Sequence, residues 1–185
     1  MSTHETLPAE SPPTDEPENT ESAGVIGKLA GWIDRADPGT RAALSRLDPD
    51  AMRPHQMAAL SRALIGAGLS PENWHPATWK QWALIAHGMA LAGHGKGPLG
   101  KQFAEADVSE ARVTKLLVSR GDAFLQIVPR LLRLLASKQV QPNWYTFGAL
   151  IRHNDSEDSH EQAKVEALRL HIAGQYFSAL SRKAT

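Results

Sequence analysis

The sequence contains no cysteine. This absence excludes disulfide bonds, a thiolate nucleophile and cysteine-ligated zinc, and it suits a reducing compartment. Long hydrophobic runs are also missing, because Arg, Lys, His or Pro interrupts each apolar stretch before it could cross a bilayer. The N-terminus lacks the basic and apolar segments of a signal peptide. We therefore expect a cytoplasmic protein that makes no membrane contact.

Strand patterns and internal repeats are equally scarce. No alternating runs rich in Val, Ile and Thr stand between turn signals, whereas from residue 25 onward apolar residues recur at helical spacing. A repeat of roughly 20 to 50 residues, as in a solenoid, is not visible. The 185 residues allow one substantial core or two small cores packed together. The sequence predicts an all-α fold, a bundle of two packed helical subdomains.

Positive charge is absent from residues 1–22, which contain six Asp or Glu side chains and no Lys or Arg. This segment is rich in Pro, Ser, Thr and Glu and almost lacks large apolar side chains, so we expect a disordered acidic tail. The whole chain has a formal net charge of zero, but residues 23–185 hold 20 basic and 14 acidic groups. The tail is interpreted as a solubilising extension, with weak competition for a basic face as the alternative.

The N-terminal helical subdomain is expected over residues 23–95. Its predicted helices cover residues 25–35, 38–46 and 54–67, followed by one in "HPATWKQWALIAHGMALAG". Apolar residues surround this last helix on more than one side, which predicts that it is buried as a central element. The glycine-rich "GHGKGPLG" is then expected to form a flexible connection.

The C-terminal helical subdomain is expected over residues 96–185. In "GDAFLQIVPRLLRLLASK" a core face alternates with a polar stripe, and Pro129 inside this pattern predicts a kink or two shorter helices. "NWYTFGALIRH" predicts a short helix, and a last helix is expected over about residues 157–180. The polar stripe consists of Asp122, Gln126, Arg130, Arg133 and Ser137.

Catalytic signatures are missing as well. There is no Gly-x-Ser-x-Gly elbow, no carboxylate pair on an apolar face and no phosphate-loop spacing, so we expect no enzymatic activity and no cofactor. His153, Asp155, Asp158 and His160 lie close together in sequence, but the HExxH spacing of a helix-borne metal site is absent. We interpret them as a polar connection and expect no metal.

The stretch "LGKQFAEADVSEARVTKLLVSRGD" (residues 99–122) predicts two short helices around a polar corner. A helix-turn-helix reading is disfavoured, because Asp107 stands where glycine is usual and Phe103 is bulky where the helices must approach. A DNA-binding regulator nevertheless remains an alternative. The second helix is two-faced, with Arg112 and Lys115 one turn apart on its polar side.

The next predicted helix repeats this basic face with Arg130 and Arg133. Residues 80–138 contain nine basic and four acidic side chains. Arginine can fork to phosphate oxygens without reading base sequence, and several such contacts give salt-dependent binding. We interpret these stripes as a surface for nucleic-acid backbone, with a solvated face on a protein–protein adaptor as the alternative.

Four motifs in order resemble the CasB family, the small subunit of the type I-E CRISPR Cascade complex: "RADPGTRAALSRL", "WKQWALIAHGMA", "GPLGKQFAEADVSEARVTKLL" and "PRLLRLLASKQVQPNWYTFGALI". The resemblance covers about residues 25–180 and omits the acidic tail. It implies an all-helical, non-enzymatic protein present as two copies lying head to tail. Its partners would be guide RNA, target DNA, the large subunit, the backbone subunits and a second copy of itself.

The family role implied by this resemblance is to hold the R-loop, in which the target strand pairs with guide RNA and the other strand is displaced. Two positions depart from the family pattern: Ser45 stands where a basic residue is frequent, and Pro129 precedes the "RLLRLL" helix. The nucleic-acid-binding residues expected from the match are Arg41, Arg46, Lys101, Arg112, Lys115, Arg130 and Arg133.

Overall fold

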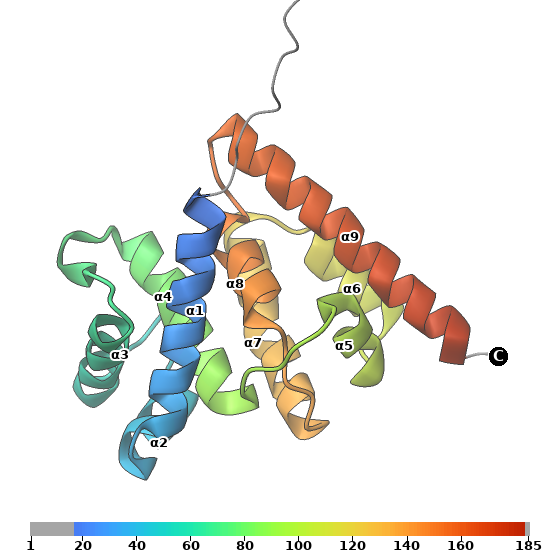
Figure 1. Ribbon diagram of the computed structural model, residues 1–185. Coiled ribbons are helices and arrows are strands. Elements are labelled where there is room, and N and C mark those ends of the chain that lie inside the picture. Colours follow the sequence, from blue (N-terminus) through green and yellow to red (C-terminus); the bar gives the residue numbers. More distant parts are fainter. Residues whose placement is uncertain (1–16, 184–185) are drawn as a thin grey trace, which may run out of the picture.

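The computed structural model describes the backbone of residues 17–183 and the side chains of residues 24–183. Within this part of the chain all regular structure is helical (Figure 1), which confirms the predicted all-α fold. The elements are α1 (Pro17–Arg35), α2 (Pro38–Ser45), α3 (Pro54–Gly66), the 3-10 turn η1 (Pro71–Asn73), α4 (Pro76–Ala92), α5 (Leu99–Glu105), α6 (Glu110–Val118), α7 (Gly121–Ser137), α8 (Trp144–His153) and α9 (Ser159–Lys183).

The structure covers only the last residues of the predicted acidic tail, residues 17–22, and these are helical and not disordered as expected. Residues 1–16 lie outside the described residues, and α1 takes in residues 17–22, so this helix begins before the predicted start at residue 25. The other helices of the first half begin close to their predicted positions. The sequence signals are clear at α2, where Pro38 occupies the first turn and the Asp37 carboxylate accepts a hydrogen bond from the Thr40 amide at 3.0 Å.

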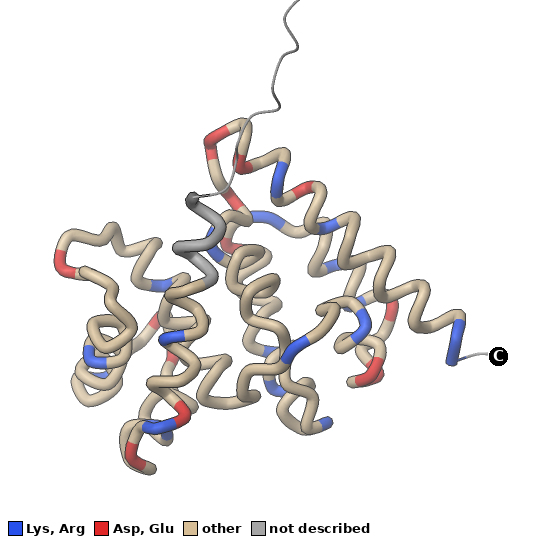
Figure 2. The backbone as a smooth tube through the Cα atoms, viewed as in Figure 1, with Lys and Arg blue, Asp and Glu red and all other residues tan. Residues whose placement is uncertain are grey.

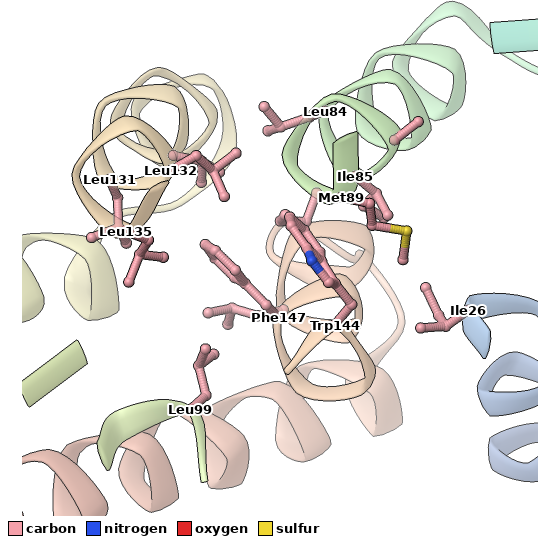
Figure 3. Close-up of a cluster of buried hydrophobic side chains, with 14 of the residues drawn as sticks. Ile26, Leu84, Ile85, Met89, Leu99, Leu131, Leu132, Leu135, Trp144 and Phe147 are labelled. Carbon is pink, nitrogen blue, oxygen red and sulfur yellow. The ribbon is translucent and has the colours of Figure 1, made fainter. Parts of the chain in front are cut away.

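Helix α4 is the centre of the bundle, as its apolar pattern predicts. It packs against α1, α2, α3, α7 and α8, and most of its residues from Trp82 to Ala92 are buried. Figure 3 shows Trp144 and Phe147 of α8 projecting into the space between α4 and α7. Their rings stack with centroids 5.3 Å apart, and the Trp144 indole donates to the Gly93 carbonyl at 2.7 Å.

One cluster of buried side chains runs through both predicted halves, from Ile26 in α1 to Tyr176 in α9. The α4–α5 connection, residues 93–98, adds a backbone contact between them, because the Gly95 amide donates to the Pro142 carbonyl at 3.1 Å. The buried core is continuous across the two predicted subdomains, and the division at residues 95 and 96 remains a prediction. No helix within residues 17–183 has the length and apolar content to cross a bilayer.

Helix α7 corrects the expectation of two shorter helices around Pro129. The helix runs unbroken from Gly121 to Ser137 with the proline inside it. Proline removes one ladder hydrogen bond, but buried residues on both sides, including Val128 and Leu132, anchor the two halves to the same core. Packing therefore outweighs the local cost of the proline.

Helix α5 lies directly against α9, and this is the most extensive contact between two helices of the described chain. Gly100 makes the approach possible: a Cβ atom there would overlap the Ile172 carbonyl oxygen and lie 2.8 Å from the Tyr176 nitrogen. The Gly100 amide donates to the Gln175 side chain at 3.1 Å across the same contact. Because the obstacles are backbone atoms, a side chain at this position requires the two helices to separate.

The variant Gly100→Ala is expected to lower the free energy of unfolding by about 2 kcal/mol, the usual range for an overpacked core. Gly24 of α1 provides the control, because a Cβ there meets nothing within 4 Å. Gly24→Ala should leave stability unchanged or slightly higher. Urea titration followed by circular dichroism measures both; equal stability of the two variants would show that α5 and α9 do not need the close approach.

Candidate nucleic-acid interface

All seven basic residues expected from the sequence lie on the surface. Figure 2 shows that Lys and Arg are distributed over the whole bundle, while many acidic positions lie near helix ends. The exposed residues come from four helices or their ends: Arg41 in α2, Arg46 at its C-terminal cap, Lys101 in α5, Arg112 and Lys115 in α6, and Arg130 and Arg133 in α7.

Six of the seven have no carboxylate partner within residues 24–183. The exception is Lys101, whose ammonium lies 3.7 Å from the Glu105 carboxylate one turn later. An exposed cation without an internal ion pair keeps its donors available to an external anion. The structure thus leaves these side chains accessible to phosphate.

Helix α6 presents Arg112 and Lys115 on its solvent side because Val113, Leu116 and Leu117 are buried on the other. It packs against α7 and α9. At its start the Tyr176 hydroxyl of α9 donates to the carbonyl of Val108 at 2.5 Å, while burial raises the pKa of this tyrosine. The basic face of α6 is therefore fixed by contacts on the opposite face.

Asp107 stands at the corner between α5 and α6, where glycine is usual, and it adopts the backbone conformation that such a corner requires. Asp107 adopts a left-handed conformation with φ of 54°, which Asp tolerates better than most residues. Its carboxylate accepts from Lys183 at 3.1 Å and from Lys138 at 3.2 Å. These two hydrogen bonds lower the pKa of Asp107. The corner is thereby tied to the ends of α7 and α9, and Phe103 of α5 is buried in the core.

A cluster of charged side chains holds the junction between α6 and α7, and the sequence analysis missed it. Arg169 of α9 is buried and donates to the carbonyls of Leu117 at 2.7 Å and Ser119 at 3.1 Å. Arg120 donates to the same two carbonyls, and its guanidinium binds the Glu166 carboxylate at 2.5 Å. Burial lowers the pKa of Arg169 to about 10, so this arginine remains charged at neutral pH.

The signal for this cluster was present in the sequence. Arg169 interrupts the apolar face of α9 between Val165 and Ile172, at the spacing of a core position. A charged residue there predicts burial with hydrogen-bond partners. Those partners are the last carbonyls of α6, which a helix cannot satisfy by itself. Arg169 and Arg120 thus hold the end of α6, where the chain turns into α7, against α9. These contacts help to set the orientation of the basic faces of α6 and α7.

Arg46 lies at a cleft of about 580 Å³ between α2 and the start of α3. Arg53 and His55 line the same cleft, and neither was expected from the sequence; Asp48 is its acidic member. Buried Gln56 shapes the cleft, because its amide donates to the Arg46 carbonyl at 2.8 Å and accepts from the Arg53 amide at 3.0 Å. The residues line one cleft only because the chain turns back between α2 and α3.

Arg133, in the polar stripe of α7, lies close enough to His87 of α4 to affect its pKa. The basic part of the stripe is therefore next to the first half of the chain. The His87 ring nitrogen Nδ1 is 3.2 Å from the Leu44 carbonyl in α2, within hydrogen-bond distance. Burial lowers the pKa of His87, and the positive charge of Arg133 lowers it further. Near the other end of the stripe, Lys80 binds Asp122 at 3.7 Å and Asp50 at 2.7 Å. Lys80 thus pairs with Asp122, the acidic residue of the stripe, whereas Arg130 and Arg133 have no carboxylate partner within the described residues.

The depressed pKa of His87 predicts how stability changes with pH. The unfolded chain binds protons near the ordinary value of 6.5, whereas the folded chain resists protonation at His87 and, also through burial, at His94. The free energy of unfolding should therefore fall as pH decreases below about 6.5 towards the folded-state pKa values. Denaturation between pH 7.5 and 5 measures this slope. His87→Gln should make the slope shallower, and an unchanged slope would contradict the assignment.

The polar connection between α8 and α9 is organised by hydrogen bonds rather than by converging metal ligands. Asp158 accepts from the amides of His160 at 2.8 Å and Glu161 at 2.9 Å, which caps α9. These hydrogen bonds lower the pKa of Asp158. Within the described residues no three His, Asp or Glu side chains are placed to hold a metal ion.

Comparison with known families decides what kind of chain presents this surface. A family model described as CRISPR-associated protein Cse2 matches residues 40–177, most of the chain, and this range includes all seven basic residues. The chain belongs to the Cse2 family. This confirms the CasB resemblance, and Cse2 membership implies a subunit of a CRISPR Cascade complex. No curated protein and no solved structure shows a significant match.

Proposed function

We propose that this Cse2 chain is a non-catalytic subunit of type I-E Cascade that contacts nucleic-acid backbone and stabilises the R-loop. The observation that supports the proposal is the exposure of seven Lys and Arg side chains within the family match, six of them without a carboxylate partner in the described chain. Guide RNA paired with the target strand, and the displaced strand, are the polyanions that these cations would bind. In this proposal base pairing reads the sequence and the protein reads the backbone.

A small number of phosphate contacts is sufficient for such a role. The RNA–DNA duplex formed in an R-loop is about as stable as the DNA duplex that it replaces, so the exchange is nearly balanced. Each added backbone contact shifts the balance towards the open state, whatever the sequence. Arginines on rigid helices suit this task, because their position is set by a packed core before the nucleic acid arrives.

The proposed partners follow from the same assembly. They are guide RNA, target DNA, the large subunit, the backbone subunits and a second copy of the chain, and the proposed compartment is the cytoplasm. The cleft around Arg46 adds Arg53 and His55 to the proposed contacts, because all three line the same opening. A helix-turn-helix regulator would instead require Arg112 and Lys115 to select one base sequence.

The experiment that tests the proposed function compares Cascade assembled with and without this chain. R-loops are formed on a negatively supercoiled plasmid, and their lifetime is followed after a competitor target is added. The proposal predicts a shorter lifetime without the chain on every target, because backbone contacts are lost. An equal lifetime in both assemblies would contradict it.

A further inference from the structure

Two guanidinium groups converge on one carboxylate oxygen at the end of α6. Nη2 of Arg120 lies 2.5 Å from Oε1 of Glu166, and Nε of Arg169 lies 3.6 Å from the same oxygen. The first contact is a hydrogen bond, and the second is too long to be one. Arg120 follows α6 in the chain, whereas Glu166 and Arg169 belong to α9, which packs against α6 (Figure 1).

Both arginines are held by backbone carbonyls and not only by Glu166. Nη1 of Arg120 donates to the carbonyls of Leu117 at 2.9 Å and Ser119 at 3.0 Å. Nη1 of Arg169 donates to the same two carbonyls. These hydrogen bonds fix each guanidinium group through a different nitrogen from the one that faces Glu166. The two donors therefore keep their positions if the carboxylate moves away, as in a preorganised binding site.

The Nε donor of Arg169 indicates that Glu166 satisfies this pair of arginines incompletely. The Arg169 side chain is only 3% exposed, and its Nε has no hydrogen-bond partner within the described residues. A buried donor of a charged group is costly to leave without a partner, and each such case calls for an explanation. A phosphate carries several acceptor oxygens, so a single phosphate group can accept from Arg120 and Arg169 together.

Access and charge both suit an anion that arrives from solvent. The Glu166 side chain is 53% exposed, compared with 39% for Arg120, so it can leave without disturbing the core. An exposed ion pair of this kind contributes little to stability. Two positive groups face one negative group, so a positive charge remains even while Glu166 is bound. Burial lowers the pKa of Arg169, the charge of Arg120 lowers it further, and Glu166 raises it.

We propose that Arg120 and Arg169 form a phosphate-binding site in which Glu166 is the resident anion, and that a backbone phosphate of a bound strand displaces it. The identity of the ligand rests on the proposed function, whereas the existence of the site does not. Arg120 thereby becomes a further backbone contact, which is available only when Glu166 has moved away.

Glu166 makes this site selective for strands over free anions. The carboxylate is attached to the same helix as Arg169, so its effective concentration at the site is high and free phosphate competes poorly. A strand already held by Arg112 and Lys115 of α6 presents its next phosphates close to the end of that helix. Such a phosphate is also tethered, and it competes with Glu166 on equal terms.

Removing the resident anion should open the site to inorganic phosphate. In Glu166→Ala, added phosphate should raise the urea midpoint of unfolding, because an anion that binds only the folded chain stabilises it. Glu72→Ala is the matched control, since Glu72 is an exposed carboxylate of η1, in another part of the fold. Phosphate also stabilises folded proteins in general, and that effect is common to both variants.

The outcome is the difference between the two variants at equal ionic strength, after circular dichroism has verified that both fold. A larger phosphate-dependent rise for Glu166→Ala, abolished by adding Arg120→Gln, supports the site. An equal rise in Glu166→Ala and Glu72→Ala would overturn it.

The second measurement tests displacement by a strand. The apparent affinity of a site is reduced by the fraction of molecules in which it is closed, so Glu166→Ala should bind single-stranded DNA about fivefold more tightly than the wild type at low salt. Glu72→Ala should change this affinity far less, although it alters the net charge equally. Fluorescence anisotropy measures both, and an affinity of Glu166→Ala no higher than that of Glu72→Ala would contradict displacement.

The two measurements separate this inference from the proposed function. If neither the wild type nor any variant binds DNA, the proposed function and displacement by a strand both fail, and the phosphate titration still decides whether the site exists. If the wild type binds DNA but Glu166→Ala and Glu72→Ala respond equally to phosphate, the site is wrong and the proposed backbone contacts of the other basic residues stand.

Discussion

Replacing Arg112, Arg130 and Arg133 by Glu is expected to weaken binding to single-stranded DNA and to R-loops about 100-fold or more at low salt. The three side chains are exposed, and none has a carboxylate partner within the described residues. Each substitution removes a phosphate contact and adds a repulsive charge. The loss should be similar for all target sequences, because backbone contacts do not distinguish bases.

The control for this variant changes the net charge by the same amount at other exposed positions. Lys28, Arg62 and Arg182 lie on α1, α3 and α9, and their replacement by Glu should cost far less affinity. Fluorescence anisotropy with a labelled strand at two salt concentrations measures both variants. The Arg112, Arg130 and Arg133 variant should also show a weaker salt dependence, by about 0.7 in log–log slope per lost contact. Equal binding by both variants would mean that only the overall charge matters.

Replacing Arg169 by Leu is expected to lower the free energy of unfolding by about 4 kcal/mol. Arg169 is 3% exposed and donates to the carbonyls of Leu117 and Ser119, and more distantly, at 3.5 Å, to that of Asn154. Its guanidinium also lies over the Phe124 ring, 5.5 Å from the centroid. Leucine leaves these carbonyls without their buried donor, and it cannot replace the link between α9 and the α6–α7 junction.

Arg182→Leu is the matched control, because Arg182 lies on the same helix but is exposed. It should change stability by less than about 0.5 kcal/mol. Urea denaturation of the two variants, followed by tryptophan fluorescence, provides the comparison. If Arg169→Leu unfolds at the same urea concentration as Arg182→Leu, the carbonyls of the junction have found other partners and the cluster does not stabilise the fold.

The sequence predicted those parts of the fold that depend on local pattern. Apolar residues around α4 predicted its central position, and the stripe from Asp122 to Ser137 predicted the solvent face of α7. The expectation of two shorter helices around Pro129 was wrong, because local propensity does not include the core contacts on both sides of the proline; the alternative of a kink at Pro129 stays a prediction. The spacing of apolar residues therefore predicted which face of a helix is buried better than it predicted where the helix begins or whether it is interrupted.

The parts of the site that were missed depend on residues distant in sequence. Arg169 acquires its role only when α9 lies against the end of α6, about 50 residues earlier in the chain. Arg53 and His55 join Arg46 only through the turn shaped by Gln56. Sequence reasoning found exposed cations on helices, since an amphipathic pattern reveals exposure, but it could not show which cations share a cleft or which one is buried.

The central claim is that the chain binds nucleic-acid backbone irrespective of base sequence. Its most direct test is the affinity of the wild-type chain for several unrelated single strands and duplexes of equal length across a range of salt concentrations. The account predicts that strands of different sequence bind within about a factor of three of one another, with the same log–log salt slope. One sequence bound about 1,000-fold more tightly than the others, or no binding to any strand at low salt, would contradict it.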